Sequence, residues 1–125
     1  MENRQYSFEK LHVWNDIREM IKYIYALTAD YPDFEKFGLV NQMRRAAISV
    51  SSNLAEGSSR TGAKDQAHFY QLAYSSSMEL LSQTIVSLDL NFINQEQHQQ
   101  LRTYIQGIAY KLNALRKQSL KRVNP

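Results

Sequence analysis

The sequence predicts an all-α protein that folds as an antiparallel up-and-down four-helix bundle. Only four glycines and two prolines interrupt its 125 residues, and so few helix breakers favour long elements. Apolar residues recur at steps of three and four in four successive segments, which is the spacing of one face of a helix. Sustained two-residue alternation, the pattern of strands, does not occur in the sequence. Short connections between such helices favour antiparallel neighbours.

The first two helices are expected over residues 9–31 and 34–57. Pro32 disfavours helical geometry at the residue before it, and Asp33 is placed to cap the second helix with its side-chain oxygen. Gly57 lies where the second helix is expected to end. The apolar stripe of the first helix contains Val13, Ile17, Met20, Ile24 and Leu27, and that of the second contains Leu39, Met43, Val50 and Leu54.

The last two helices are expected over residues 61–91 and 95–122. Asn94 and Gln97 lie three residues apart and resemble a capping box that opens the fourth helix. The apolar stripe of the third helix contains Phe69, Leu72, Leu80, Leu81 and Ile85, and that of the fourth contains Leu101, Ile105, Ile108, Leu112 and Leu115. No linker divides the chain, so we expect one domain over residues 1–125.

Composition excludes several classes of protein. The chain contains no cysteine, which removes disulfides, thiol nucleophiles and thiolate metal ligands. No apolar run reaches the roughly 18 residues that a membrane-spanning helix needs, and the N-terminus lacks the apolar stretch of a signal peptide. We therefore expect a cytoplasmic protein without a membrane partner.

Charge is distributed unevenly along the sequence. Residues 1–96 contain 9 basic and 12 acidic residues, a net charge of −3, whereas residues 97–125 carry a net charge of +6 without any acid. The six cations are Arg102, Lys111, Arg116, Lys117, Lys121 and Arg122. Such an asymmetry suggests an anionic partner. The alternative is that cations near the end of a helix only complement its negative C-terminal end.

Polar side chains of the second and third helices fall beside apolar positions. They are Arg45, Ser49, Asn53, Glu56, Ser76 and Glu79. Buried charges are costly unless they are paired, so we interpret the six residues as a structural network in which Arg45 donates to Glu56 or Glu79. Arg44 lies about 100° around the helix from Arg45 and is expected to face a ligand.

Catalysis by this cluster is the weaker interpretation. Glu56 and Glu79 could form a carboxylate pair, but a metal site needs further ligands. The histidines His12, His68 and His98 are far apart, and no Glu-x-x-His pattern occurs. We therefore expect no catalytic residue, no metal and no cofactor, and the protein is not expected to be an enzyme.

Three stretches carry a family resemblance. They are "FEKLHVW" at 8–14, "YPDFEKFGLVNQMRRAAISVSSNLAEG" at 31–57 and "FYQLAYSSSMEL" at 69–80. Together they resemble the four-helix bundle proteins encoded in intervening sequences of 23S rRNA genes, a family sometimes labelled ribosomal protein. This family is similar to the accessory variability determinant of diversity-generating retroelements. The most specific part is the pattern Q-x-R-R-A-A-x-S-x-x-x-N-x-A-E-G, which starts at Gln42.

The resemblance implies an assembly and partners that the residues alone do not. It implies that subunits form a homopentameric barrel. For the retroelement relatives it also implies a basic surface that binds nucleic acid and a partnership with a reverse transcriptase. It does not imply a constituent of the ribosome.

Two functions remain open from the sequence. The first is a non-catalytic RNA- or DNA-binding protein whose six C-terminal cations and Arg44 contact phosphates, with Tyr104 and Tyr110 placed to stack on bases or to pack in the fold. The second is an oligomeric scaffold or protein-interaction module, in which aromatic residues line a subunit interface as easily as a core. They include Tyr6, Phe8, Tyr25 and Phe37.

Overall fold

The computed structural model describes residues 3–123, which form four α-helices, two short 3-10 helices and no strand. The prediction of an all-α fold with four helices is therefore confirmed for this part of the chain. The elements in order are η1 (Ser7–Lys10), α1 (His12–Thr28), η2 (Asp33–Glu35), α2 (Leu39–Ser59), α3 (Ala63–Asp89) and α4 (Gln95–Val123).

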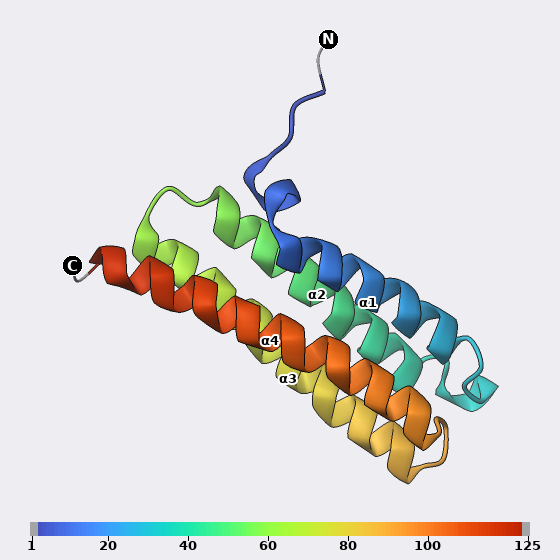
Figure 1. The fold of residues 1–125 in the computed structure, drawn as a ribbon. Coiled ribbons are helices and arrows are strands. Elements are labelled where there is room, and N and C mark those ends of the chain that lie inside the picture. Colours follow the sequence, from blue (N-terminus) through green and yellow to red (C-terminus); the bar gives the residue numbers. More distant parts are fainter. Residues whose placement is uncertain (1–2, 124–125) are drawn as a thin grey trace.

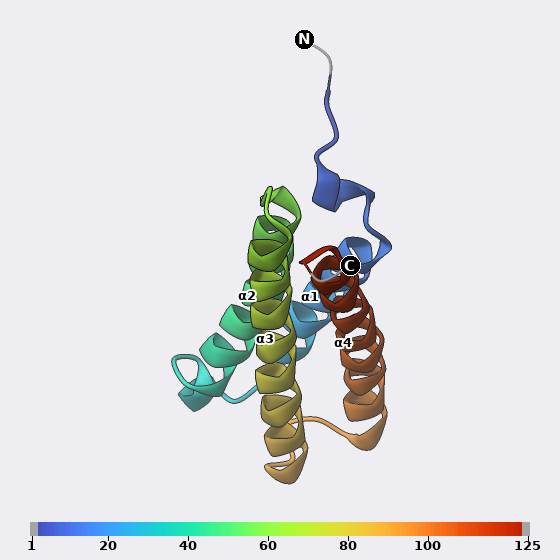
Figure 2. The ribbon, with the colours of Figure 1, turned by 90° about the vertical axis from the view of Figure 1, so that its left-hand side faces the viewer.

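The helices run up and down, and each packs against its neighbours in the chain (Figure 1). The connections α1–α2 and α3–α4 lie at one end of the bundle. The α2–α3 connection and the end of α4 lie at the other end. Figure 2 shows α4 beside both α3 and α1, so the last helix closes the ring of helices.

The core lies between the four helices and is almost wholly apolar. Its fully buried large side chains include Ile17, Met20, Ile24, Met43, Leu54, Leu80, Leu101, Ile105, Ile108 and Leu112. These residues come from every helix and lie on the predicted stripes. Two members of the predicted stripe of the third helix are an exception, because Leu72 and Ile85 are exposed. Several buried hydroxyls are satisfied within their own helix, as when Thr84 donates to the carbonyl of Leu80 at 2.8 Å.

The N-terminal boundaries of the first two helices differ from the prediction. Ser7–Lys10 form a 3-10 turn, and the extended backbone of Leu11 separates this turn from α1, which begins at His12 instead of residue 9. The second helix begins at Leu39 instead of residue 34, because Asp33–Glu35 form a separate 3-10 turn. Asp33 is therefore not the cap. The Glu35 carboxylate instead accepts the backbone N–H of Leu39 at 2.9 Å.

The other boundaries differ less from the prediction. The first helix ends at Thr28, three residues before the predicted end. The second continues past Gly57 to Ser59, and the third begins and ends two residues inside the predicted range. The Asn94 side chain accepts from the Gln97 backbone N–H at 2.8 Å, and the Gln97 side chain accepts from the Asn94 N–H at 2.9 Å. This capping box opens the fourth helix at the predicted residue.

Within residues 3–123, none of the helices is long and apolar enough to span a membrane.

Candidate nucleic-acid interface

The six cations of the C-terminal segment all lie on α4 but point in different directions. Arg102 and Arg116 are half-buried at the edge of the packed face, whereas Lys111, Lys117, Lys121 and Arg122 are exposed. Helical spacing places Lys117 and Lys121 on one outward face together with Tyr110. The basic segment is therefore a solvent-facing surface of α4 with two arginines along its border.

Two of the six cations have partners within the fold. The Lys111 ammonium donates to the Asp16 carboxylate of α1, and both side chains are about half exposed. Arg122 donates to the Gln66 side chain of α3, which also accepts a hydrogen bond from Ser119 at 3.3 Å. Within residues 3–123, the other four cations have no hydrogen-bond or ion-pair partner. These four are Arg102, Arg116, Lys117 and Lys121.

The two ends of the bundle differ in charge. The end with the α1–α2 and α3–α4 connections carries the acids Asp30, Asp33, Glu35, Asp89 and Glu96. The opposite end carries the cations Lys10, Arg60, Lys64, Lys117, Lys121 and Arg122 and the acids Glu9, Glu56 and Asp65. Arg116, Lys117, Lys121 and Arg122 therefore lie toward the end of the bundle where cations outnumber acids, whereas Arg102 lies toward the other end.

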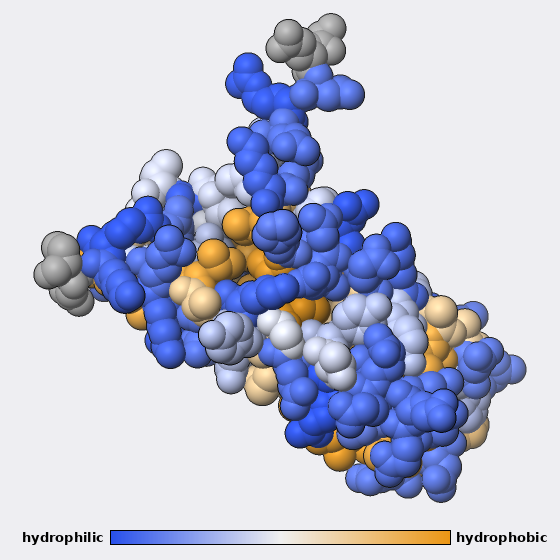
Figure 3. All heavy atoms as spheres, viewed as in Figure 1, coloured by the Kyte–Doolittle hydropathy of each residue, from blue (hydrophilic) through white to orange (hydrophobic). Residues whose placement is uncertain are grey.

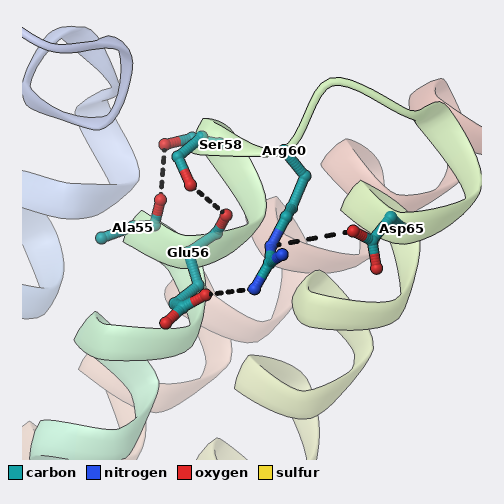
Figure 4. Close-up of polar contacts among 6 residues, drawn as sticks. Ala55, Glu56, Ser58, Arg60 and Asp65 are labelled. Carbon is teal, nitrogen blue, oxygen red and sulfur yellow. Dashed lines mark hydrogen bonds and ion pairs between the residues drawn. The ribbon is translucent and has the colours of Figure 1, made fainter.

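Arg60 in the α2–α3 connection is neutralised by its neighbours (Figure 4). Its guanidinium donates to Glu56 at 2.8 Å and lies 3.7 Å from the Asp65 carboxylate. The guanidinium also stacks over the Phe69 ring, 4.5 Å from the ring centroid. Arg60 therefore braces the connection between α2 and α3 and contributes little net charge to the basic end.

Three of the six predicted network residues come together at the boundary of α2 and α3. The hydroxyls of Ser49 and Ser76 are 2.9 Å apart, and the Asn53 amide donates to the Ser49 carbonyl at 2.9 Å and to its hydroxyl at 3.1 Å. All three side chains are half-buried. This small neutral network ties the two helices together at mid-length.

The charged members of the predicted network do not join it. Arg45, Glu56 and Glu79 are all exposed. Glu56 pairs with Arg60, and the one hydrogen bond that Glu79 accepts within residues 3–123 is a long one from Gln83 at 3.4 Å. The expectation that Arg45 donates to Glu56 or Glu79 is therefore wrong. Met43, Ala46, Ala47, Val50 and Leu54 occupy the core face of α2, which turns Arg45 toward water.

The roles expected of Arg44 and Arg45 are reversed. Arg44 faces α1, where it donates to the Thr28 hydroxyl at 3.0 Å and to the Tyr25 carbonyl at 3.2 Å. Its guanidinium also stacks over the Tyr25 ring, 4.5 Å from the centroid. Arg44 therefore holds α1 to α2 and is not free to contact a ligand. Arg45 is the arginine that faces solvent.

A shallow polar depression surrounds Arg45 on the outer face of α2. It consists of two adjoining hollows of about 430 and 440 Å³ that share Asn41, Arg45 and Ser49. One hollow reaches Phe37, whose side chain is 87% exposed, and the other reaches Ile48, which is 42% exposed. Sequence patterns do not predict this depression, because it depends on how the α1–α2 connection folds back beside α2.

The two tyrosines of α4 have different environments. Tyr104 is half-buried and packs against Tyr23, with the ring centroids 5.9 Å apart. Tyr110 is 78% exposed. Of the two rings placed to stack on a base, Tyr104 belongs to the packing of the fold and Tyr110 faces solvent.

Ionisation and metal chemistry add little to this surface. Burial raises the pKa of the Tyr31 and Tyr70 phenols above the usual value of 10.0, but both rings belong to the core. Among residues 3–123, no three histidine, aspartate or glutamate side chains gather in a way that could hold a metal ion.

Fold and surface together define a class, the antiparallel four-helix bundle with a cation-rich last helix. The model of the family described as "23S rRNA-intervening sequence protein" matches residues 9–114. The chain belongs to this family, and the resemblance seen in the sequence is confirmed.

A solved structure shares the fold. It is described as a protein with unknown function from the S23 ribosomal protein family of Bacteroides thetaiotaomicron, and it is similar to this chain with a TM-score of 0.76 at 18% identity. The similarity covers 84% of this chain and 98% of that chain. No curated protein matches the chain.

Proposed function

We propose that this chain is a non-catalytic nucleic-acid-binding protein whose α4 surface contacts phosphates of RNA or DNA. The observation that carries the proposal is the group Arg116, Lys117 and Lys121. These cations lie within two turns of α4 and have no acidic partner within residues 3–123. Phosphate contacts by such side chains provide affinity with little sequence preference.

Stabilisation of the helix end does not explain all of these cations. The interaction of a cation with the helix dipole decays within the last turn. Of the six cations, only Lys121 and Arg122 lie in the last turn of α4. Arg102, Arg116 and Lys117 lie further back, so their charges need another explanation, which phosphate binding provides.

Removal of two charges tests the proposal. The double variant Lys117→Gln/Lys121→Gln is compared with Lys22→Gln/Lys36→Gln, which removes two exposed charges elsewhere. Binding of labelled RNA and DNA is measured across a salt series. The α4 variant is expected to bind more weakly and to lose about 0.9 from the slope of log affinity against log salt for each lost phosphate contact.

The control variant and the salt dependence show whether the proposal holds. The control variant is expected to keep the wild-type affinity and slope. If the wild-type chain does not bind at low salt, or binds with an affinity that salt does not change, the proposal is wrong. Equal losses in both double variants would show that net charge matters and that the α4 surface does not.

We further propose that the chain forms a homo-oligomer, a pentamer by the family resemblance. The depression around Arg45 supports this because exposed Phe37, Ile48 and Tyr25 border it, and aromatic residues and arginine are enriched at protein interfaces. Repetition of a weak phosphate site around an oligomer raises avidity. Light scattering coupled to gel filtration tests this, and Ile48→Asp is expected to lower the observed mass. A monomeric wild-type chain would contradict it.

The second candidate is an oligomeric scaffold or protein-interaction module. Exposed Phe37 beside Arg45 favours it, because both residue types serve as interface anchors. A reverse transcriptase is the partner that the likeness to the retroelement protein suggests for such a scaffold. Unchanged nucleic-acid binding in Lys117→Gln/Lys121→Gln would favour this candidate.

A further inference from the structure

An apolar groove lies between the start of α1 and the second half of α4. Its volume is about 240 Å³, and its lining includes Leu11 and Val13 from the α1 side and Tyr110, Ala114 and Leu115 from α4. Figure 3 shows hydrophobic side chains at the surface between these two helices, with hydrophilic side chains around them. This groove is smaller than the roughly 300 to 1,000 Å³ of pockets that enclose whole drug-sized ligands, so it suits one small flat group.

Tyr110 at the border of the groove is not needed by the core. Its side chain is 78% exposed, whereas Tyr31 and Tyr70 in the core are each 5% exposed. Within residues 3–123, Tyr110 forms no side-chain hydrogen bond and no close aromatic pair. An exposed aromatic ring beside an apolar groove offers a face on which another ring can stack.

Cations continue from Tyr110 toward the end of α4. Lys117 follows Tyr110 by seven residues and Lys121 follows by eleven, on the same outward face. At 1.5 Å per residue these intervals are about 10 and 16 Å along the helix. Lys111 and Gln118 of α4 also line the groove. Proteins that bind single-stranded nucleic acid combine aromatic rings that stack on bases with cations that contact the phosphates. Tyr110 followed by Lys117 and Lys121 is such a combination.

We propose that this groove receives one unpaired nucleobase against Tyr110, while Lys117 and Lys121 contact the phosphates that follow. The inference rests on the proposed function and makes it specific, because it assigns the α4 surface to single-stranded nucleic acid. A base inside a duplex is stacked on both sides and exposes only its edges. A base must therefore leave a stack, or lie in a single strand, before its face can reach Tyr110.

Three probes separate base contacts from phosphate contacts. They are fluorescein-labelled oligothymidylate, an abasic strand with the same number of phosphates, and a duplex with the same number of phosphates. The wild-type chain is expected to bind oligothymidylate most tightly, because only this probe offers both phosphates and unstacked bases. Equal affinity for oligothymidylate and the abasic strand would overturn the proposal.

Substitution of Tyr110 gives the decisive comparison. Tyr110→Ala is expected to weaken oligothymidylate binding by about 5- to 150-fold, the loss of one base stack, and to leave abasic-strand and duplex binding unchanged. Tyr110→Phe keeps the ring and is expected to bind like the wild type. Phe34→Ala removes an aromatic ring that is also 78% exposed but lies in η2, away from the groove and outside the lining of the depression around Arg45, and serves as the matched control. Ultraviolet crosslinking is expected to attach the thymine to Tyr110.

The results distinguish failure of the groove from failure of the proposed function. If Lys117→Gln/Lys121→Gln weakens binding of all three probes while Tyr110→Ala changes none, phosphate binding stands and the base site is wrong. If no probe binds, both proposals are wrong. If poly-glutamate displaces oligothymidylate from the wild-type chain but does not bind Tyr110→Ala, the groove recognises acidic peptide and the base site is again wrong.

Discussion

The helices α2 and α3 approach each other closely, whereas a groove remains between α1 and α4. We call the first the closed contact and the second the open contact. At the first, an added Cβ on Gly57 would lie 2.8 Å from the Tyr70 ring, and the Ser49 and Ser76 hydroxyls are hydrogen-bonded across the boundary. At the second, the half-exposed Lys111–Asp16 ion pair joins helices that leave a groove of about 240 Å³.

The difference separates residues that stabilise the fold from residues that are available to a partner. At the closed contact Ser49, Asn53 and Ser76 bind one another, and Gly57 and Tyr70 are buried against each other. At the open contact an aromatic ring and cations face solvent. Substitutions at the closed contact should therefore change the free energy of unfolding, and those at the open contact should change binding.

The largest effect on stability is expected from Gly57→Ala. The new methyl group would overlap the buried Tyr70 ring and lie 3.0 Å from the Phe69 Cβ, so α2 and α3 must separate. Overpacking of this kind costs about 1 to 3 kcal/mol, of which the better helix propensity of alanine recovers up to about 1 kcal/mol. Urea unfolding followed by circular dichroism measures the change. A variant as stable as the wild type would show that the contact is not closed.

Gly107→Ala is the matched substitution on α4. Apart from the neighbouring backbone of α4 itself, no atom of the described residues lies within 4 Å of the position that its Cβ would occupy, so the methyl group meets no obstacle. Alanine is expected to stabilise the protein by about 0.4 to 1 kcal/mol, because it lowers the entropy of the unfolded chain and favours the helix. The same urea experiment applies, and destabilisation would contradict the prediction.

The sequence predicts a helix end correctly where the capping residues are close together in the chain. The pair Asn94 and Gln97 forms its box within four residues, and the structure has that box. The predicted start of α2 is wrong because two acids, Asp33 and Glu35, precede the helix and either residue type can accept a hydrogen bond from its first backbone N–H groups. The choice between them depends on how the chain turns at Gly38.

Side-chain partners were predicted less well than helices. Arg44 and Arg45 are adjacent, and their roles depend on which side of α2 lies against α1, a property of the packed bundle. The pair Glu56 and Arg60 carries a local signal, the spacing of four residues, and could have been predicted from the sequence. Tyr104 and Tyr110 are both tyrosines that lie among the cations of α4, so the sequence does not distinguish them. The structure shows that Tyr104 is packed and Tyr110 is exposed.

A third prediction compares Tyr70 at the closed contact with Tyr110 at the open one. Burial raises the pKa of the Tyr70 phenol above 10.0, although the nearby Arg122 charge opposes this effect. The unfolded chain therefore loses this proton at lower pH than the folded chain. Stability from this group is complete below pH 10 and is lost as the pH rises through the raised value. Thermal melts from pH 8 to above pH 10 should fall less steeply for Tyr70→Phe. Tyr110→Phe, at a ring that is 78% exposed, is the matched substitution at the open contact.

The smallest effect on stability, and a clear effect on binding, is expected from Asp16→Asn. The carboxylate holds the Lys111 ammonium beside the groove, and both side chains are about half exposed. Exposed ion pairs contribute at most about 1 kcal/mol, so the urea midpoint should change little. The substitution releases Lys111 to a phosphate and removes a negative charge from the surface that we propose for nucleic acid.

Asp16→Asn is therefore expected to tighten oligothymidylate binding at low salt and to increase the salt slope by about 0.7, the value for one added phosphate contact on a single strand. Glu19→Gln is the matched control, because it also removes a carboxylate from α1 that pairs with a lysine, Lys22, but not with a cation of α4. Fluorescence anisotropy across a salt series measures both variants. Equal gains in the two variants would indicate that net charge alone governs binding, whereas a gain confined to Asp16→Asn would place the nucleic acid beside Lys111.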